Sequence, residues 1–117
     1  ASPDSMKSSI DVLNSYKDGR KIAILGTMNE LGDESINAHT DVGYYAREKV
    51  DLLIAIGKYK DCYKKGYTLD NIITFENKED LISNLYKIIK KNDVILLKAS
   101  RGMKFEEIVS SLEEVQI

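Results

Sequence analysis

The sequence has 117 residues and a formal net charge of −2, and 43% of its residues are hydrophobic. This length suits one domain, and the interspersed charges give no electrostatic reason to expect a nucleic-acid or membrane partner. No signal peptide is visible, and no apolar run approaches the roughly 20 residues that a membrane-spanning helix needs. Cys62 is the single cysteine, so an internal disulfide is excluded, no metal-ligand set is visible around it, and a reduced, cytoplasmic setting is expected.

The first two predicted elements are a helix and a buried strand. Ser2 and Pro3 form a helix start signal, because serine caps a helix and proline suits its first turn. The helix is expected to run from about Pro3 to Tyr16, where an Asp-Gly pair follows, and the apolar strand 21–25 comes next. Its uninterrupted apolar residues are typical of a strand covered on both faces of a parallel sheet.

The rest of the chain repeats this alternation. The second helix is expected to be capped by Asp33 or Ser35 and to face the sheet with a stripe that begins at Ile36 and includes His39. Strands alternating with helices imply βαβ units with right-handed crossovers and a mostly parallel sheet. The further elements expected in chain order are strand 51–56, a short helix 59–65, strand 71–75, a helix capped by Asn77, strand 94–97 and a last helix carrying Phe105 and Ile108.

Two polar loops are candidates for function. In such a sheet the loops that leave the carboxyl ends of the strands lie at one edge, where ligands of open α/β sheets bind. The loop 27–33 offers polar side chains to this edge, and the loop 98–102 offers Lys98, Ser100 and Arg101. A guanidinium beside the start of a helix favours carboxylate or phosphate, so these three residues form a candidate anion site. The alternative is that Lys98 and Arg101 are solvated loop ends.

Familiar catalytic and phosphate-binding patterns are absent from the sequence. It contains neither G-x-x-x-x-G-K-[ST] nor G-x-G-x-x-G, so the glycines of the first loop could serve turn geometry alone. His39, the only histidine, has two interpretations: a core residue hydrogen-bonded to a neighbour, or a functional group close to the first loop. No catalytic triad, zinc spacing or acidic pair is recognisable. Spacing alone therefore supports a ligand-binding α/β domain without specifying a reaction.

Three ordered motifs carry a resemblance to a known family. They are Ser-Pro-Asp-Ser-Met at 2–6, Leu-Gly-Thr-Met-Asn-Glu-Leu-Gly at 25–32 and Lys-Ala-Ser-Arg-Gly-Met at 98–103, with His39 between the second and the third. Over essentially the whole chain they resemble the C-terminal domain of the Mur ligases. Within that family they are most similar to the members that add D-alanyl-D-alanine to UDP-N-acetylmuramoyl-tripeptide.

The resemblance implies a Rossmann-like three-layer α/β domain, residues 1–117, that is the third domain of a longer cytoplasmic enzyme of peptidoglycan synthesis. Such an enzyme is an ATP-dependent amide ligase: it uses Mg-ATP to phosphorylate the tripeptide carboxylate, and the amine of the dipeptide then attacks. The P-loop and the Mg²⁺ ligands would belong to the central domain, and UDP-sugar recognition to the N-terminal domain. The fragment itself would therefore hold no catalytic residue and no metal ligand, and alone it would be inactive.

The resemblance also implies two groups of site residues, one at the ATP and one at the carboxylate of the incoming dipeptide. The ATP group is Ser2, Thr27, Glu30 and His39, and the dipeptide group is Lys98, Ser100 and Arg101.

Three positions depart from the family pattern, since Ser2 replaces asparagine, Thr27 replaces aspartate and Ala99 replaces glycine. Thr27 keeps a hydroxyl but loses a charge, and Ala99 is tolerated only where the backbone does not need positive φ. The alternative functions are another Mur-type ligase domain with a different incoming amine, and a free-standing flavodoxin-like binding module.

Overall fold

The computed structural model describes residues 1–113, and within them it contains five α-helices, two short 3₁₀ helices and four strands. Every predicted helix and strand is present. The elements are α1 (Pro3–Ser15), β1 (Lys21–Leu25), η1 (Gly32–Glu34), α2 (Ser35–Tyr45), β2 (Leu52–Ile56), α3 (Lys60–Tyr67), β3 (Ile72–Phe75), α4 (Lys78–Ile88), β4 (Val94–Lys98), η2 (Arg101–Met103) and α5 (Glu106–Glu113).

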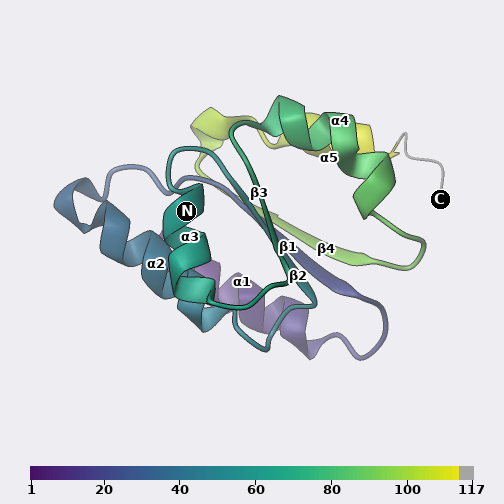
Figure 1. Ribbon diagram of the computed structural model, residues 1–117, viewed down its shortest axis with the longest axis horizontal. Helices are drawn as coiled ribbons and strands as arrows, with labels where there is room; N and C mark the ends of the chain where they lie inside the picture. The colour runs from purple at the N-terminus through teal and green to yellow at the C-terminus, as the bar shows by residue number, and fades with distance from the viewer. Residues whose placement is uncertain (114–117) are drawn as a thin grey trace.

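The four strands form one parallel sheet in the order β3-β2-β1-β4 (Figure 1). All three strand pairs are parallel, and Ile24 of β1 lies opposite Ile54 of β2 and Leu97 of β4. β1 thus has a neighbour on each side, and its residues 22–25 are fully buried. This explains the uninterrupted apolar sequence of the strand, and it confirms the predicted parallel sheet.

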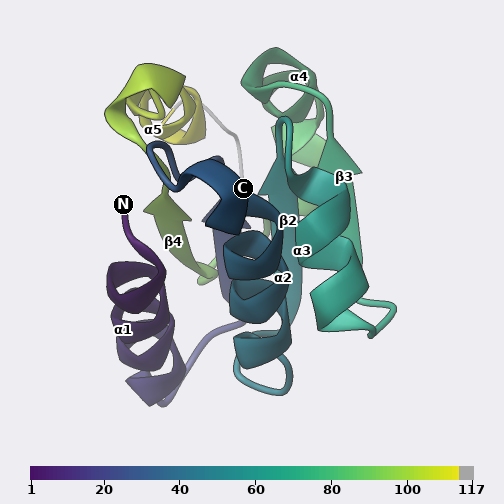
Figure 2. The same cartoon turned by 90° about the vertical axis from the view of Figure 1, so that its left-hand side faces the viewer.

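Helices cover both faces of the sheet, which gives the three layers expected (Figures 1 and 2). Ala23 and Leu25 point to the face covered by α1, α2 and α3, where they pack with Met6 and Tyr63. The alternate residues of the same strand point to the other face, which α4 and α5 cover. β1 therefore contributes to two separate hydrophobic cores, and the loop that follows it is anchored between them.

α2 and α3 pack with their backbones in contact, because each has a glycine at the crossing. A Cβ added to Gly43 would lie 2.3 Å from the carbonyl oxygen of Tyr63, and one added to Gly66 would lie 1.8 Å from that of Thr40. Such distances are too short for any side chain. Both positions therefore require glycine, and this contact fixes Tyr63 close to the centre of α2.

Two helix starts follow the sequence prediction. The Ser2 hydroxyl accepts the Ser5 N–H at 3.1 Å and the Ser5 side chain reciprocates, while the Asn77 Oδ1 accepts the Asp80 N–H at 2.9 Å. These side chains satisfy N–H groups that have no partner inside the helix.

The start of α2 differs from its prediction in two ways. The turn η1 leads into the helix and Glu34 takes the cap position without a side-chain hydrogen bond, so neither Asp33 nor Ser35 is the cap. Ile36 is 62% exposed, so its assignment to the inner stripe is wrong. The buried face is centred on Ser35 and His39, and successive residues of a helix turn by about 100°, which carries Ile36 away from that face.

The amino edge of the sheet is held together by charged side chains. Arg20 donates two hydrogen bonds to the Asp93 carboxylate, at 2.8 and 3.1 Å, and one to the carbonyl oxygen of Ile88. The Asp93 side chain is 3% exposed. Burial would raise the pKa of the Asp93 carboxyl, but the hydrogen bonds from Arg20 and the Lys90 N–H outweigh it and lower that pKa. These contacts join the start of β1 to the start of β4.

Candidate functional site

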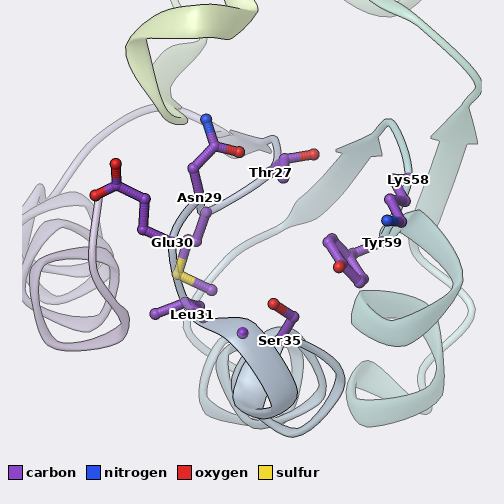
Figure 3. A pocket seen from close by; sticks show the side chains of 9 residues that line it. Thr27, Asn29, Glu30, Leu31, Ser35, Lys58 and Tyr59 are labelled. Carbon is purple, nitrogen blue, oxygen red and sulfur yellow. The ribbon is translucent and has the colours of Figure 1, made fainter.

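Three pockets lie at the carboxyl edge of the sheet. Pocket A, of about 280 Å³, lies between loop 27–32 and the Lys58-Tyr59 pair (Figure 3). Pocket B, of about 370 Å³, lies between Thr27, Lys58 and residues 76–79. Pocket C, of about 320 Å³, is lined by residues 97–101 together with Phe105 and Glu106. The two loops chosen from the sequence therefore line separate pockets at one edge.

Thr27 is common to pockets A and B, and its backbone is fixed on three sides. The buried hydroxyl of Tyr63 donates to the carbonyl oxygen of Gly26 at 2.6 Å, and the N–H of Met28 donates to Nε2 of His39 at 2.9 Å. The carbonyl oxygen of Thr27 itself accepts the Ser100 N–H at 2.9 Å. The threonine hydroxyl is thereby held at the boundary between two pockets. Burial raises the pKa of the Tyr63 hydroxyl, so this group stays a donor.

Ser100 joins the two loops that were chosen as candidates from the sequence. Its backbone N–H donates to Thr27, and its side-chain oxygen accepts the Asn29 N–H at 2.7 Å. The residue is 8% exposed. Because the hydroxyl accepts in this contact, its own proton remains available for another acceptor in pocket C. The sequence prediction placed Ser100 at a ligand, and the structure adds that it fastens the first loop to the second.

Lys98 and Arg101 lie with Ser100 in the lining of pocket C. Within residues 1–113 neither cation forms an ion pair, and the exposed Arg101 begins the turn η2. Ala99 does not have positive φ, so alanine is accommodated where the family has glycine. The structure thus brings the three residues of the predicted anion site together in one pocket, with Glu106 at its border.

The four residues predicted at the ATP occupy different places. Thr27 and Glu30 line pocket A, whereas His39 is completely buried and Ser2 lines none of the three pockets. Glu30 is exposed and has a φ of 65°. A left-handed backbone costs a residue with a side chain about 1–2 kcal/mol, so the loop holds this glutamate in a strained conformation at the pocket.

His39 has the geometry of a hydrogen-bonded core histidine, which is the first of its two interpretations. Its ring stacks on Tyr59 with 4.2 Å between centroids and meets the edge of Tyr63 at 5.2 Å. Nδ1 lies 2.6 Å from the carbonyl oxygen of Ser35, and Nε2 accepts the Met28 N–H. Burial lowers the pKa of His39, and the hydrogen bond to Ser35 opposes this shift. Direct contact of its ring with a nucleotide stays a prediction.

The sequence reasoning missed Lys58 and Tyr59. They follow β2 in the way that loop 27–32 follows β1, after an apolar strand that ends in a glycine, and Gly57 has a φ of 98°. Lys58 is exposed and lines pockets A and B, facing loop 27–32 across pocket A (Figure 3). The same strand-then-glycine signal that identified the first loop was present here, and it would have identified this pair.

Two further features of residues 1–113 bear on the kind of site present. No group of three or more His, Cys, Asp or Glu side chains in this range is arranged to hold a metal ion. Among the described helices, none combines the length and apolar character that crossing a bilayer requires.

These features define a parallel α/β domain whose ligand pockets lie at the carboxyl edge of its sheet. A family model described as the glutamate ligase domain of Mur ligases matches residues 1–101. The chain therefore belongs to the Mur ligase family, as its three motifs indicated.

The most similar relatives share one enzyme name. The chain is 38% identical to UDP-N-acetylmuramoyl-tripeptide–D-alanyl-D-alanine ligase of Bacillus subtilis, over 97% of the chain and 26% of that protein, and 32% identical to the same enzyme of Escherichia coli. Among solved structures it is similar to MurF from Acinetobacter baumannii (TM-score 0.87, 28% identity) and to MurF ligase from Thermotoga maritima in complex with ADP (TM-score 0.79, 29% identity). Both comparisons cover 97% of this chain and 26% of the neighbour. The chain thus spans about a quarter of the length of these relatives.

Proposed function

We propose that this chain is the C-terminal domain of a three-domain, ATP-dependent ligase that adds D-alanyl-D-alanine to UDP-N-acetylmuramoyl-tripeptide in the cytoplasm. The names of the relatives support the reaction. One observation supports the role of this domain in the reaction: pockets A and C lie at the same edge of the sheet, and their loops are joined through Ser100. A domain that brings a nucleotide and an amine together needs two such loops at one edge.

On the nucleotide side, the proposal assigns ATP to the edge that carries pocket A. Thr27 offers a hydroxyl, Glu30 a carboxylate that suits ribose hydroxyls, and Lys58 a cation that suits phosphate. Ser2 does not line this pocket, so it would approach the nucleotide only from outside it. His39 would affect the nucleotide only indirectly, through the loop that it holds. The ADP complex of the Thermotoga relative supports a nucleotide in this family.

On the amine side, the proposal assigns the dipeptide carboxylate to pocket C. Arg101 presents a fork that matches a carboxylate, Lys98 adds a second positive charge, and the Ser100 hydroxyl has one proton to donate. These groups would hold the end of the dipeptide that does not react and leave its amine free. The alternative function, a ligase domain with a different incoming amine, can be tested at the same pocket. It predicts that pocket C prefers a carboxylate ligand other than D-alanyl-D-alanine.

The chain's own residues bind and orient rather than carry out the bond changes. Magnesium, when bound, would screen the phosphate charges. Following the family resemblance, the proposal assigns its ligands to a central domain. Closing the edge with pockets A and C over the acyl phosphate would keep water away until the amine arrives. The isolated chain is accordingly expected to be inactive, and a free-standing flavodoxin-like role has no support in the relatives found.

A titration of the ¹⁵N-labelled chain with D-alanyl-D-alanine, followed by Mg-ATP, tests this proposal. The dipeptide should shift the amides of residues 98–102 saturably, whereas its C-terminal amide, which lacks the carboxylate, should not. Mg-ATP should shift residues 27–32 and 58–59. Saturable shifts confined to another surface, such as the surroundings of Cys62, would contradict the assignment of either ligand to this edge.

A further inference from the structure

The segment 26–28 is fastened to the helix pair α2 and α3 by two buried side chains. Tyr63 of α3 donates to the carbonyl oxygen of Gly26, and His39 of α2 accepts the N–H of Met28. Both partners are backbone groups that flank Thr27. All three side chains, Met28, His39 and Tyr63, have at most 1% of their surface exposed. Water therefore does not replace either contact while the structure stays closed.

The hydrogen bonds of His39 define its protonation state. Nε2 accepts an amide N–H, so it carries no proton, and in a neutral ring the proton must then be on Nδ1. Nδ1 accordingly donates to the carbonyl oxygen of Ser35 at 2.6 Å. If Nε2 gained a proton, two N–H groups would face each other at 2.9 Å, and the Met28 N–H would lose its acceptor.

The groups packed against the imidazole do not favour a positive charge. From α3 and the residue before it come the rings of Tyr63 and Tyr59, and from α2 comes the Ser35 carbonyl. Charged groups also stand on and beside these elements. Glu34 at the start of α2 and Asp41 within it are exposed, Lys60 of α3 is paired with Asp61 and Glu76, and Lys58 and the exposed Glu30 lie at the pocket surface. None of them contributes to the shift of the His39 pKa. A protonated ring would therefore be buried without a carboxylate to compensate it.

We propose that His39 is a positioning residue that holds the wall shared by pockets A and B, and that its protonation releases Met28 and loosens loop 27–29, which then keeps only the hydrogen bonds to Tyr63 and Ser100. The loop is then ordered in neutral solution and loosened in mild acid. This inference deepens the proposed function, but the pH-dependent order of the loop does not depend on it. Only one consequence rests on the proposed function, namely that nucleotide affinity falls together with the order of the loop.

The direction of the pH effect follows from burial. The folded-state pKa of His39 is lowered from 6.5, so the closed loop binds a proton less readily than the open one. The stability of the closed loop is thus complete above pH 6.5 and decreases as the pH falls below that value. No second histidine exists in the chain to produce the same transition.

The test is an NMR titration of the ligand-free chain from pH 7.5 to pH 5. At the neutral end the imidazole ¹⁵N shifts should identify an Nδ1–H ring. On acidification the amides of residues 27–29 should change together with the imidazole, with one midpoint below 6.5, while the amides around Arg20 at the other edge of the sheet stay constant. Amides 27–29 that stay constant through the imidazole transition would overturn the proposal, as would an Nε2–H ring at neutral pH.

Two substitutions at the same position separate positioning from mere packing. His39→Gln offers an amide oxygen to Met28 but does not titrate, so its loop should stay closed and independent of pH over this range. His39→Phe keeps a ring against Tyr59 but has no acceptor, so the Met28 amide should exchange about tenfold faster at every pH. Tyr63→Phe, which leaves His39 intact, should keep the transition. If the Gln variant retained the pH dependence of residues 27–29, His39 would not be its source.

A Mg-ADP titration at pH 7.5 and at pH 5.5 distinguishes this inference from the proposed function. Binding that weakens with acid in the native chain and stays constant in His39→Gln supports both. Absence of binding at pH 7.5 counts against the proposed nucleotide site, whereas the pH transition of the ligand-free loop is still measured and decides the role of His39 by itself.

Discussion

The two edges of the sheet use their charged residues in opposite ways. At the amino edge, Arg20 and Asp93 are bound to each other, and the Asp51 carboxylate accepts the Lys21 N–H at 2.7 Å. At the carboxyl edge, Lys58 and Arg101 are exposed and, within residues 1–113, belong to no ion pair. Charged side chains thus join the strands at the amino edge, whereas the cations Lys58 and Arg101, which line the pockets of the carboxyl edge, are left available for ligands.

At the carboxyl edge, the segment 26–29 is held by neutral hydrogen bonds to its backbone, whereas the Lys60–Glu76 and Lys78–Glu107 ion pairs join other parts of that edge. His39, Tyr63 and Ser100 each contact the segment 26–29 without contributing a charge. Neutral contacts of this kind fix the loop without using Lys58, Lys98 and Arg101, the cations that line pockets A, B and C. If this division holds, substitutions at the amino edge should change stability and spare binding, and those at the carboxyl edge should do the reverse.

The largest effect is expected at Asp93. Asp93→Ala leaves the Arg20 guanidinium without its carboxylate in a mostly buried place, and we expect the free energy of unfolding to fall by about 3 kcal/mol. Urea denaturation measures this loss, and ligand titration below the unfolding transition should show unchanged affinity. Asp61→Ala removes the exposed partner of Lys60 and is the matched control, with an expected loss below about 0.5 kcal/mol. A similar loss in both variants would contradict the structural role of the amino edge.

The same carboxylate predicts the direction of acid sensitivity. Because the folded-state pKa of Asp93 is lowered from 3.8, its contribution is complete above that pH and is lost as the pH falls further below it. Asp93→Asn cannot ionise, so its stability should depend less steeply on pH in this range than that of the native chain.

The next effect is expected where the helices that support the carboxyl edge touch. Gly66→Ala introduces a methyl group against the Thr40 carbonyl oxygen, and separating α2 from α3 should cost about 2–3 kcal/mol. Since Tyr63 and His39 come from these helices, the amide shifts of residues 26–28 should also change. Gly32→Ala is a useful contrast, because Gly32 has open space around it and only its φ of 55° opposes a side chain. Unchanged shifts at 26–28 in Gly66→Ala would show that the loop does not depend on the helix pair.

A smaller effect, confined to binding, is expected at Arg101. Arg101→Ala should weaken D-alanyl-D-alanine binding about tenfold, because one charged hydrogen-bonding fork is lost. Stability should change by less than about 0.5 kcal/mol, since the residue is exposed. Calorimetric titration and thermal unfolding of the same variant measure both quantities. Unchanged affinity would instead favour the alternative interpretation, that Arg101 is a solvated loop end.

The features that the sequence predicted correctly are those whose causes are local. The capping residues Ser2 and Asn77 lie only three residues from the N–H groups that they accept. The uninterrupted apolar sequence of β1 likewise predicts a strand with a neighbour on each side. The loop pattern also grouped Lys98 with Arg101, and both line pocket C, while their binding of a carboxylate stays a prediction.

The Lys58-Tyr59 pair was missed although its strand-then-glycine signal is local, whereas the other missed contacts join distant segments. The Ser100 hydroxyl meets the Asn29 N–H across 71 positions of sequence, and this contact exists only because β4 lies next to β1. Alternating helices and strands predict parallel pairing but not the strand order that makes these loops neighbours. The side-chain cap expected for α2 failed for a related reason: a 3₁₀ turn and the burial of Ser35 decide how that helix begins.

The smallest effect is expected at Glu30, where function and stability should change in opposite directions. Asparagine tolerates the left-handed conformation better than glutamate, so Glu30→Asn should stabilise the chain by about 0.5 kcal/mol. It also removes the carboxylate proposed for ribose, so Mg-ATP affinity should decrease. Thermal unfolding and the Mg-ATP titration measure the two effects. A variant that was both less stable and unchanged in affinity would contradict the assignment of strain to this residue.

The hydrogen bonds of Ser100 have a thermodynamic consequence for the two ligand loops. The N–H of Ser100 and the N–H of Asn29 tie residues 27–29 to residues 98–100, so neither segment moves far without breaking both bonds. A ligand that displaces one segment must therefore also move the other segment or break these hydrogen bonds. By thermodynamic linkage, if the first ligand changes the binding free energy of the second by some amount, the second ligand changes the binding free energy of the first by the same amount. One serine thus makes two neighbouring pockets into a reciprocally coupled pair.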